Sequence, residues 1–185
     1  MATSSNRGRR ARLRLRTLGR WLWYFETTPV FPDETLLHSL PNNQRYFVAD
    51  MGNWALSPTV FKPHPVRDLD GKSFFREDFT TPRKVAKANT HKDGVRVGRV
   101  TVRQLRELRM KAEPVPLSDE LPGHAIVPDL RYVSPQTKEE KREAKKIQAK
   151  LAEIMTKNGI YTPRGLPDPV PTPPAQTPPD NSSTA

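Results

Sequence analysis

The chain contains no cysteine among its 185 residues. This absence excludes a disulfide framework, a thiolate zinc site and a cysteine nucleophile. No apolar run approaches the roughly 18 residues that a membrane-spanning helix needs. The four histidines lack metal-ligand spacing, and neither a phosphate-cradling Gly-rich loop nor a Gly-x-Ser-x-Gly motif occurs. We therefore expect no catalytic residues, no metal, no cofactor and no small-molecule substrate, in a protein that is not an enzyme and spans no membrane.

Apolar side chains are also scarce. They make up 35% of the chain against 28% for charged residues, and the 20 prolines outnumber the 9 glycines. A chain of this composition buries little apolar surface to offset the entropy that ordering its backbone costs. We predict a mostly irregular or extended chain with α-helices, a small α+β core at most, and long segments that become ordered against a partner.

Positive charge is concentrated in two blocks of a chain whose net charge is +11. Residues 1–25 carry seven arginines and no acidic residue, and residues 83–112 carry ten basic and two acidic residues. Residues 26–82 carry five basic and eight acidic residues, so this middle region is mildly acidic. Such a distribution is typical of a protein that contacts a polyanion in two places.

Residues 1–25 are predicted to form a basic amphipathic arm. On a helical projection, Leu15, Leu18, Leu22 and Phe25 share one side, and most of the arginines gather on the other. Three interpretations are open: a mitochondrial targeting segment, an arm that grips nucleic acid, or a helix on a membrane surface. The second basic block favours a role in RNA binding, because a targeting segment needs no such block downstream. The arm is therefore interpreted as both a targeting segment and an RNA anchor.

Residues 26–82 are predicted to form a small aromatic core joined to extended, proline-punctuated chain. The stretch 32–40 is interpreted as a short helix capped by Asp33, and Tyr46–Ala49 as a strand that turns at Gly52-Asn53. The aromatic side chains are interpreted mainly as this internal core, with docking into a neighbouring protein as the alternative. The core candidates are Trp54, Phe61, Phe74, Phe75 and Phe79.

Residues 83–112 are predicted to be a basic strand–helix segment, with the strand and helix over about 95–112. The alternation of valines changes phase at Gly98, which indicates a β-bulge. Thr101 and Gln104 have the spacing of a capping box at the start of the helix.

The last third of the chain is predicted to hold a linker, a long helix and a tail. Residues 113–134 are the linker. Residues 135–158 form a charged amphipathic helix over about 135–157, capped by Ser134, whose thin apolar seam leans on one partner surface. Residues 159–185 form a proline-rich disordered tail.

Arginine is the residue best suited to hold an RNA backbone, because its planar guanidinium donates two hydrogen bonds to one phosphate. Lysine and arginine together displace condensed counterions, which supplies most of the affinity. The predicted RNA-binding residues are Arg7, Arg9, Arg10, Arg12, Arg14, Arg16, Arg20, Arg83, Lys84, Lys87, Arg96, Arg99, Arg103, Arg106, Arg109 and Lys111. Among these, Arg99, Arg103, Arg106 and Arg109 are expected to form one helical face.

A second set of residues is predicted to contact neighbouring proteins. These residues are aromatic side chains that follow the first basic block and apolar side chains at 3-4-3 spacing in the long helix. They are Trp21, Trp23, Trp54, Ala144, Ile147, Leu151 and Ile154.

The succession of a basic amphipathic start, an aromatic middle, a second arginine block and one charged helix resembles accessory proteins of mitochondrial ribosomes. The resemblance implies a structural component, bound to ribosomal RNA and neighbouring ribosomal proteins in the mitochondrial matrix and not expected to form a homo-oligomer. The cytoplasm or nucleolus is the alternative location. Two other functions are open: an extrinsic subunit or assembly factor of a mitochondrial membrane complex, and a small adaptor that uses its proline-rich tail.

Overall fold

The computed structural model describes residues 27–50, 53–89, 91, 94–115, 121–134 and 137–169, and all structural statements concern these residues. The predicted arm 1–25 and the tail from residue 170 onward lie outside them. The strands are β1 (Thr35–Pro41), β2 (Phe47–Asp50), β3 (Asn53–Leu56), β4 (Lys72–Arg76), β5 (Val95–Thr101), β6 (Glu113–Pro114), β7 (His124–Val127) and β8 (Ile160–Tyr161). The helices are η1 (Gln44–Tyr46), η2 (Pro58–Phe61), α2 (Pro82–Ala88), α3 (Val102–Glu107), η3 (Pro128–Leu130) and α4 (Lys138–Lys157), where η marks a 3-10 helix.

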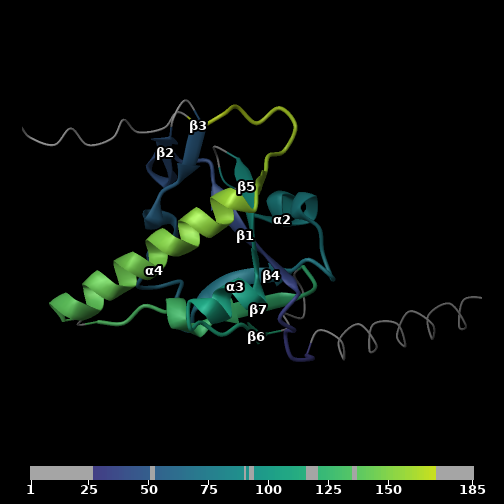
Figure 1. Cartoon of the computed structure of the whole chain (residues 1–185). Coiled ribbons are helices and arrows are strands. Elements are labelled where there is room, and N and C mark those ends of the chain that lie inside the picture. Colours follow the sequence, from purple (N-terminus) through teal and green to yellow (C-terminus); the bar gives the residue numbers. More distant parts are fainter. Residues whose placement is uncertain are drawn as a thin grey trace, which may run out of the picture.

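An antiparallel sheet organises this part of the chain. Six strands lie in the order β6-β7-β4-β1-β5-β8, and β2 and β3 form a separate hairpin (Figure 1). The prediction of a mostly irregular chain is therefore wrong. The strands are short, and many of their partners come from distant parts of the sequence, so proline-rich connections separate strands rather than replacing them.

The segment 32–40, predicted as a helix, forms the central strand β1 instead. Leu36 and Leu40 point to one face of the sheet and Leu37 to the other, and all three are fully buried. Because both faces are covered, leucines occur at adjacent positions in place of strict alternation, and such a pattern cannot be told from a buried helix by periodicity.

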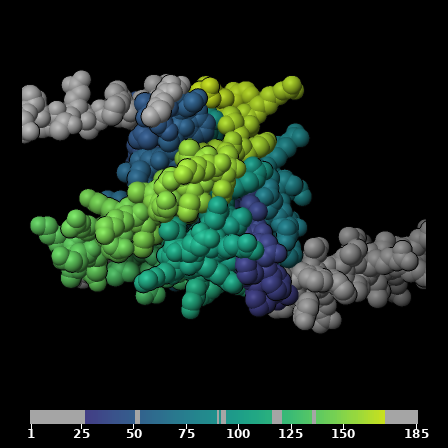
Figure 2. All heavy atoms as spheres, viewed as in Figure 1, coloured from purple at the N-terminus to yellow at the C-terminus, as the bar shows by residue number. Residues whose placement is uncertain are grey.

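Two layers cover the two faces of the sheet. The larger core contains Leu36, Phe61, Phe74 and Met155, and it is covered by α4, η2 and the β2–β3 hairpin. The smaller core contains Leu37, Phe75, Val85 and Val97 under α2. Figure 2 shows α4, in light green, lying between the blue segment that holds β2 and β3 and the teal segment that holds α3. Of the predicted core aromatics, Phe61 and Phe74 are fully buried, Phe75 is buried, and Trp54 and Phe79 are half-buried.

The capping box predicted for the basic segment is confirmed, but the bulge is not. Thr101 Oγ1 accepts a hydrogen bond from Gln104 N, and the Gln104 side chain accepts one from Thr101 N. The pairing of β1 with β5 runs through Gly98 without a bulge. A Cβ at Gly98 would lie 3.1 Å from both Leu40 Cδ1 and Met155 Sδ, so the glycine serves close packing of α4 on the sheet.

The C-terminal half of α4 belongs to the core. The helix begins at Lys138 with Thr137 as its cap and Glu140 as its capping-box partner, later than the predicted Ser134–Pro135 start. Leu151 and Met155 are fully buried, and the Thr156 hydroxyl accepts a hydrogen bond from Leu56 N at 3.0 Å. The N-terminal half is mostly exposed and extends away from the sheet (Figure 1). The segments predicted as linker and tail also contribute strands, β6 and β7 in the first case and β8 in the second.

A buried ion pair joins the start of β1 to the end of β4. Arg76 is 2% exposed and Glu34 is 7% exposed. Arg76 Nε donates to Glu34 Oε2 at 2.7 Å, and Nη2 donates to Glu34 Oε1 at 2.8 Å. Glu34 Oε1 also accepts a hydrogen bond from Phe31 N, so both carboxylate oxygens are used.

Substitution of this carboxylate is expected to destabilise the fold strongly. Glu34→Gln leaves the Arg76 charge buried beside a neutral amide, and breaking such a pair costs about 3 kcal/mol. The matched control is Glu77→Gln, whose partner Arg99 at 3.1 Å is about one-third exposed; it should cost less than about 1 kcal/mol. Urea unfolding of both variants measures the difference, and equal losses would contradict the assigned role of the buried pair.

Candidate phosphate-binding cleft

A cleft opens where β1 and β4 separate. β1 pairs with β5 at seven positions, from Thr35 to Pro41, but with β4 only at Leu36 and Leu37. Beyond Leu37 the backbones of β1 and β4 no longer pair. A side chain links the two strands there instead, because His38 Nδ1 lies 2.8 Å from Ser73 O. The strands diverge because β1 continues toward the inserted residues 42–71, and β4 begins only after that insertion.

The cleft has a volume of about 640 Å³ and is lined by six parts of the chain. β1 and β4 form its base, η1 and η2 contribute one wall, the loop 62–68 contributes another, and Asn89 at the end of α2 completes it. This volume lies within the range of small-ligand pockets, so it suits a group of nucleotide size rather than a folded helix.

The charged lining of the cleft is strongly unbalanced. Four of the five basic side chains of residues 26–82 line it, but only one of the eight acidic ones does. The basic residues are Arg45, Lys62, Arg67 and Lys72, and the acidic residue is Asp68. Lys72 and Asp68 form a largely buried ion pair at 3.0 Å. The exposed cations Arg45, Lys62 and Arg67 therefore make the electrostatic potential in the cleft positive, so the cleft attracts anions.

The loop that carries two of these cations is held by its own hydrogen bonds. His64 N donates to Asp68 Oδ2 at 2.7 Å, and His64 Nδ1 accepts from Val66 N at 3.2 Å and Arg67 N at 3.4 Å. Tyr132 N donates to Asp68 O, which ties the loop to the segment after η3. The loop backbone is thus ordered before any ligand arrives, which lowers the entropic cost of binding.

His38 is a neutral group at the base of the cleft. Its ring centroid lies 4.8 Å from that of Phe74 and 5.7 Å from that of Phe61, and the residue is 6% exposed. Burial, followed by the nearby Lys72 charge, lowers the pKa of His38 to about 4, against smaller opposing effects of the hydrogen bond to Ser73 O and of Asp68. The ring is therefore uncharged at neutral pH.

Helix α2 carries three exposed cations and ends at the cleft. Arg83, Lys84 and Lys87 are exposed on a helix whose C-terminal cap, Asn89, lines the cleft. These are three of the residues predicted to bind RNA. The predicted arginines Arg7, Arg9, Arg10, Arg12, Arg14, Arg16 and Arg20 lie outside the described residues.

Arg96, another predicted RNA contact, is an internal residue. It is fully buried, with its guanidinium over the rings of Trp54 (5.1 Å) and Phe47 (5.8 Å). It donates hydrogen bonds to Asn42 Oδ1, Thr162 Oγ1 and Pro167 O. Arg96 thus fastens the hairpin and the segment after β8 to the sheet, and we do not include it in the candidate site.

The predicted helical face of four arginines does not form. Arg99 lies in β5 and pairs with Glu77, α3 ends at Glu107, and Arg109 adopts a positive φ of 60°. Only Arg103 and Arg106 are on the helix, and both are exposed. Arg106, Arg109 and Lys111 instead line a second hollow, of about 590 Å³, together with Glu113 and apolar residues that include Val30 and Met110.

Four of the five predicted protein-contact residues in the described ranges, all except Ala144, pack within the protein itself. Trp54 is half-buried and packs edge-on against Phe47 with ring centroids 5.1 Å apart. Leu151 is fully buried, and Ile147 and Ile154 pack against the main core. Ala144 is half-buried, and Trp21 and Trp23 lie outside the described residues.

Sequence reasoning missed the cleft because its cations are scattered through a region of net negative charge. Arg45, Lys62, Arg67 and Lys72 are separated by acidic and apolar residues, and no local pattern links them. His38 is a lone histidine between Leu37 and Ser39. The fold brings these residues together by returning the inserted segment to the end of β1.

Comparison with protein-family models, curated proteins and solved structures gave no match. Every helix in the described ranges is too short or too polar to cross a membrane.

The lowered pKa of His38 predicts a pH-dependent stability. The unfolded chain binds a proton on this histidine near pH 6.5, but the folded chain does so only near pH 4. The contribution of His38 to the free energy of unfolding is therefore complete above pH 6.5. It falls by about 3 kcal/mol as the pH drops from 6.5 to 4. His38→Asn does not titrate there, and its amide still donates to Ser73 O. Urea unfolding across this pH range should give a flatter profile for the variant, and parallel profiles would contradict the assignment.

Proposed function

We propose that this protein binds RNA through phosphate contacts and that the cleft between β1 and β4 receives one nucleotide of a single-stranded segment. The observation that carries the proposal is the gathering of four basic side chains around one acidic side chain, in a region that is acidic overall. Cations brought together by a fold repel one another, and the phosphates of a ligand relieve that repulsion.

The dimensions of the cleft support a single-stranded ligand. At about 640 Å³ it accepts a sugar, its phosphate and a base, but a duplex is too wide to enter. Arg45 and Tyr46 at its rim add a flat surface, because the Arg45 guanidinium lies 4.7 Å from the centre of the Tyr46 ring. Aromatic rings and guanidinium planes stack on unpaired bases, which is how proteins commonly hold single-stranded RNA.

The exposed cations of α2 extend the proposed binding surface. Arg83 and Lys84 occupy the first turn of this helix, which contains no acidic residue. The positive end of the helix dipole lies at this turn, so cations here weaken the helix locally. Their placement fits a contact with the RNA backbone on its path from the cleft, where phosphate offsets the repulsion. Membership in a ribonucleoprotein, and residence in the mitochondrial ribosome in particular, stays a prediction.

Removal of two cleft cations is expected to weaken RNA binding and its dependence on salt. The double variant Arg45→Gln/Lys62→Gln should bind a single-stranded RNA about tenfold or more weakly. The slope of log affinity against log salt concentration should fall by about 0.7 for each lost phosphate contact. Fluorescence anisotropy at several salt concentrations measures both quantities.

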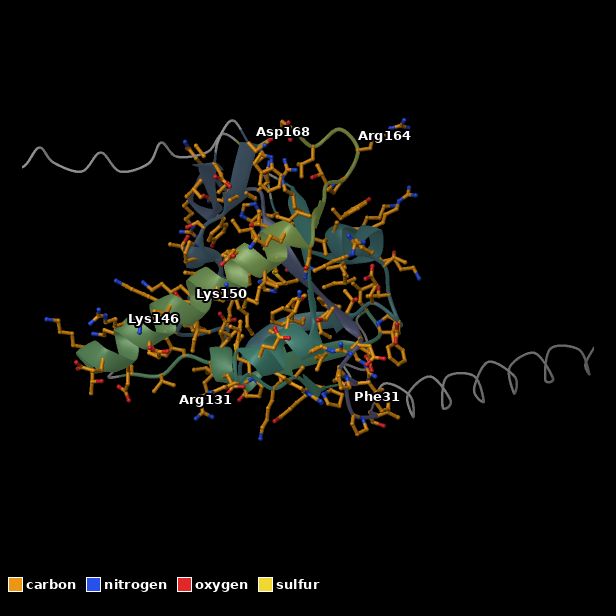
Figure 3. The ribbon with its side chains drawn as sticks, in the orientation of Figure 1. Phe31, Arg131, Lys146, Lys150, Arg164 and Asp168 are labelled. Atoms are coloured by element: carbon orange, nitrogen blue, oxygen red, sulfur yellow. The ribbon has the colours of Figure 1, made fainter. Side chains whose placement is uncertain are left out.

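The control variant removes the same charge from two side chains that do not line the cleft. Lys146 and Lys150 lie on α4, where they pair with Glu143 and Glu153 (Figure 3). Lys146→Gln/Lys150→Gln should leave the affinity and the salt slope close to those of the unaltered protein. An equal loss in both double variants would show that net charge alone acts, and would contradict the cleft as the binding site.

A further inference from the structure

His38 offers one hydrogen-bond acceptor at the base of the cleft. The carbonyl oxygen of Ser73 can only accept a hydrogen bond, so Nδ1 of His38, 2.8 Å away, carries the proton. In a neutral imidazole the other nitrogen, Nε2, then carries the lone pair. The tautomer is thus fixed by a backbone atom, and the Phe61 and Phe74 rings fix the orientation of the imidazole.

Nε2 of His38 has no hydrogen-bond partner among the described residues. The only side-chain nitrogen or oxygen of those residues that is both buried and without a partner is Thr80 Oγ1. Nε2 is therefore not fully buried, although His38 as a whole is 6% exposed, and the hollow that His38 lines is the cleft. A buried imidazole that lines a hollow, with one nitrogen committed and the other without a partner, is arranged to receive a donor from a ligand.

The charged groups that line the cleft are nearly all donors. Arg45, Lys62, Arg67 and Lys72 donate only, and Asp68 Oδ2 already accepts from Lys72 Nζ and from His64 N. Phosphate oxygens match the cationic donors, but an ionised phosphodiester has no proton to give to Nε2. A ligand that satisfies both the cations and Nε2 carries a hydroxyl donor beside its phosphate. In RNA this group is the ribose 2′-hydroxyl, on the carbon next to the one that bears the 3′-phosphate.

We infer that the cleft distinguishes RNA from DNA, with Nε2 of His38 accepting a hydrogen bond from a ribose 2′-hydroxyl while the cleft cations hold the adjoining phosphate. The inference rests on the proposed function and names the chemical group that the site reads. His38 is a specificity-determining residue that remains neutral near pH 7, because burial and the Lys72 charge lower its pKa. The 2′-hydroxyl is the feature by which a protein separates the two nucleic acids.

The experiment compares three probes on the full chain: a short uridine RNA, its deoxyuridine counterpart, and the same RNA with 2′-O-methyl groups. The RNA should bind about three- to tenfold more tightly than either other probe, which is the effect of one net hydrogen bond. The 2′-O-methyl oxygen cannot donate, so that probe should bind like the deoxy probe. A contact to a base would treat the RNA and deoxy probes alike.

Two variants separate recognition from structural support. His38→Asn keeps a donor to Ser73 O but has no group at the position of Nε2, so its RNA and deoxy affinities should become equal through a loss on RNA alone. His38→Gln reaches the Nε2 position with an amide oxygen and should retain part of the preference. A purely structural role would weaken both probes by the same factor in both variants. Far-ultraviolet circular dichroism checks that each variant is folded.

The outcomes also separate this inference from the proposed function. Equal binding of the RNA and deoxy probes by the unaltered protein overturns the role of His38 and leaves RNA binding through the cleft intact. Absence of binding to every probe overturns the proposed function and the inference with it. A ribose preference that His38→Asn leaves unchanged overturns the assignment to Nε2.

Discussion

The unequal sharing of β1 between its two neighbours is the constraint on which the rest of the described structure depends. β1 pairs with β5 along its whole length but with β4 at two positions only. A sheet that opens in this way leaves backbone groups to be satisfied by other means, and the His38 ring supplies one such bond to Ser73 O. The buried Glu34–Arg76 pair holds the same two strands together at the end where they do meet. The cleft lies at the other end, where the inserted residues 42–71 return to the sheet.

Arginines of one sequence acquire different roles from their surroundings. Arg76 is paired with a buried carboxylate, and Arg96 is stacked on two aromatic rings with its donors used by the protein itself. Arg45 and Arg67 stay exposed at the cleft. A buried guanidinium is tolerated only when its hydrogen bonds and charge are satisfied internally, so burial removes an arginine from ligand binding. The density of arginine along the sequence therefore overstates the basic surface around residues 96–99 and misses the surface around residues 45–72.

The elements that sequence reasoning located are those specified by adjacent residues. The Thr101–Gln104 capping box needs only two side chains three positions apart, and the buried Phe61 and Phe74 follow from their own hydrophobicity. The helix assigned to 32–40 and the bulge at Gly98 failed for one shared reason. Both segments are covered on two faces by parts of the chain far away in sequence, and this burial changes the pattern that a local reading depends on. The thin seam of α4 was similarly interpreted as a surface for another protein, although η2, β3 and β5 of the same chain pack against this helix.

The sequence by itself determined the charge, the absence of thiol chemistry and the positions of several turns and caps, because these depend on residue type and short-range hydrogen bonds. Only the tertiary structure decided that the chain forms an antiparallel sheet, that Arg96 is internal, and that His38 and four scattered cations share one cleft. Strand pairing joins residues that are tens of positions apart, and the entropy of closing such loops is repaid by burial summed over the whole fold. No short stretch of the chain therefore specifies which strands pair.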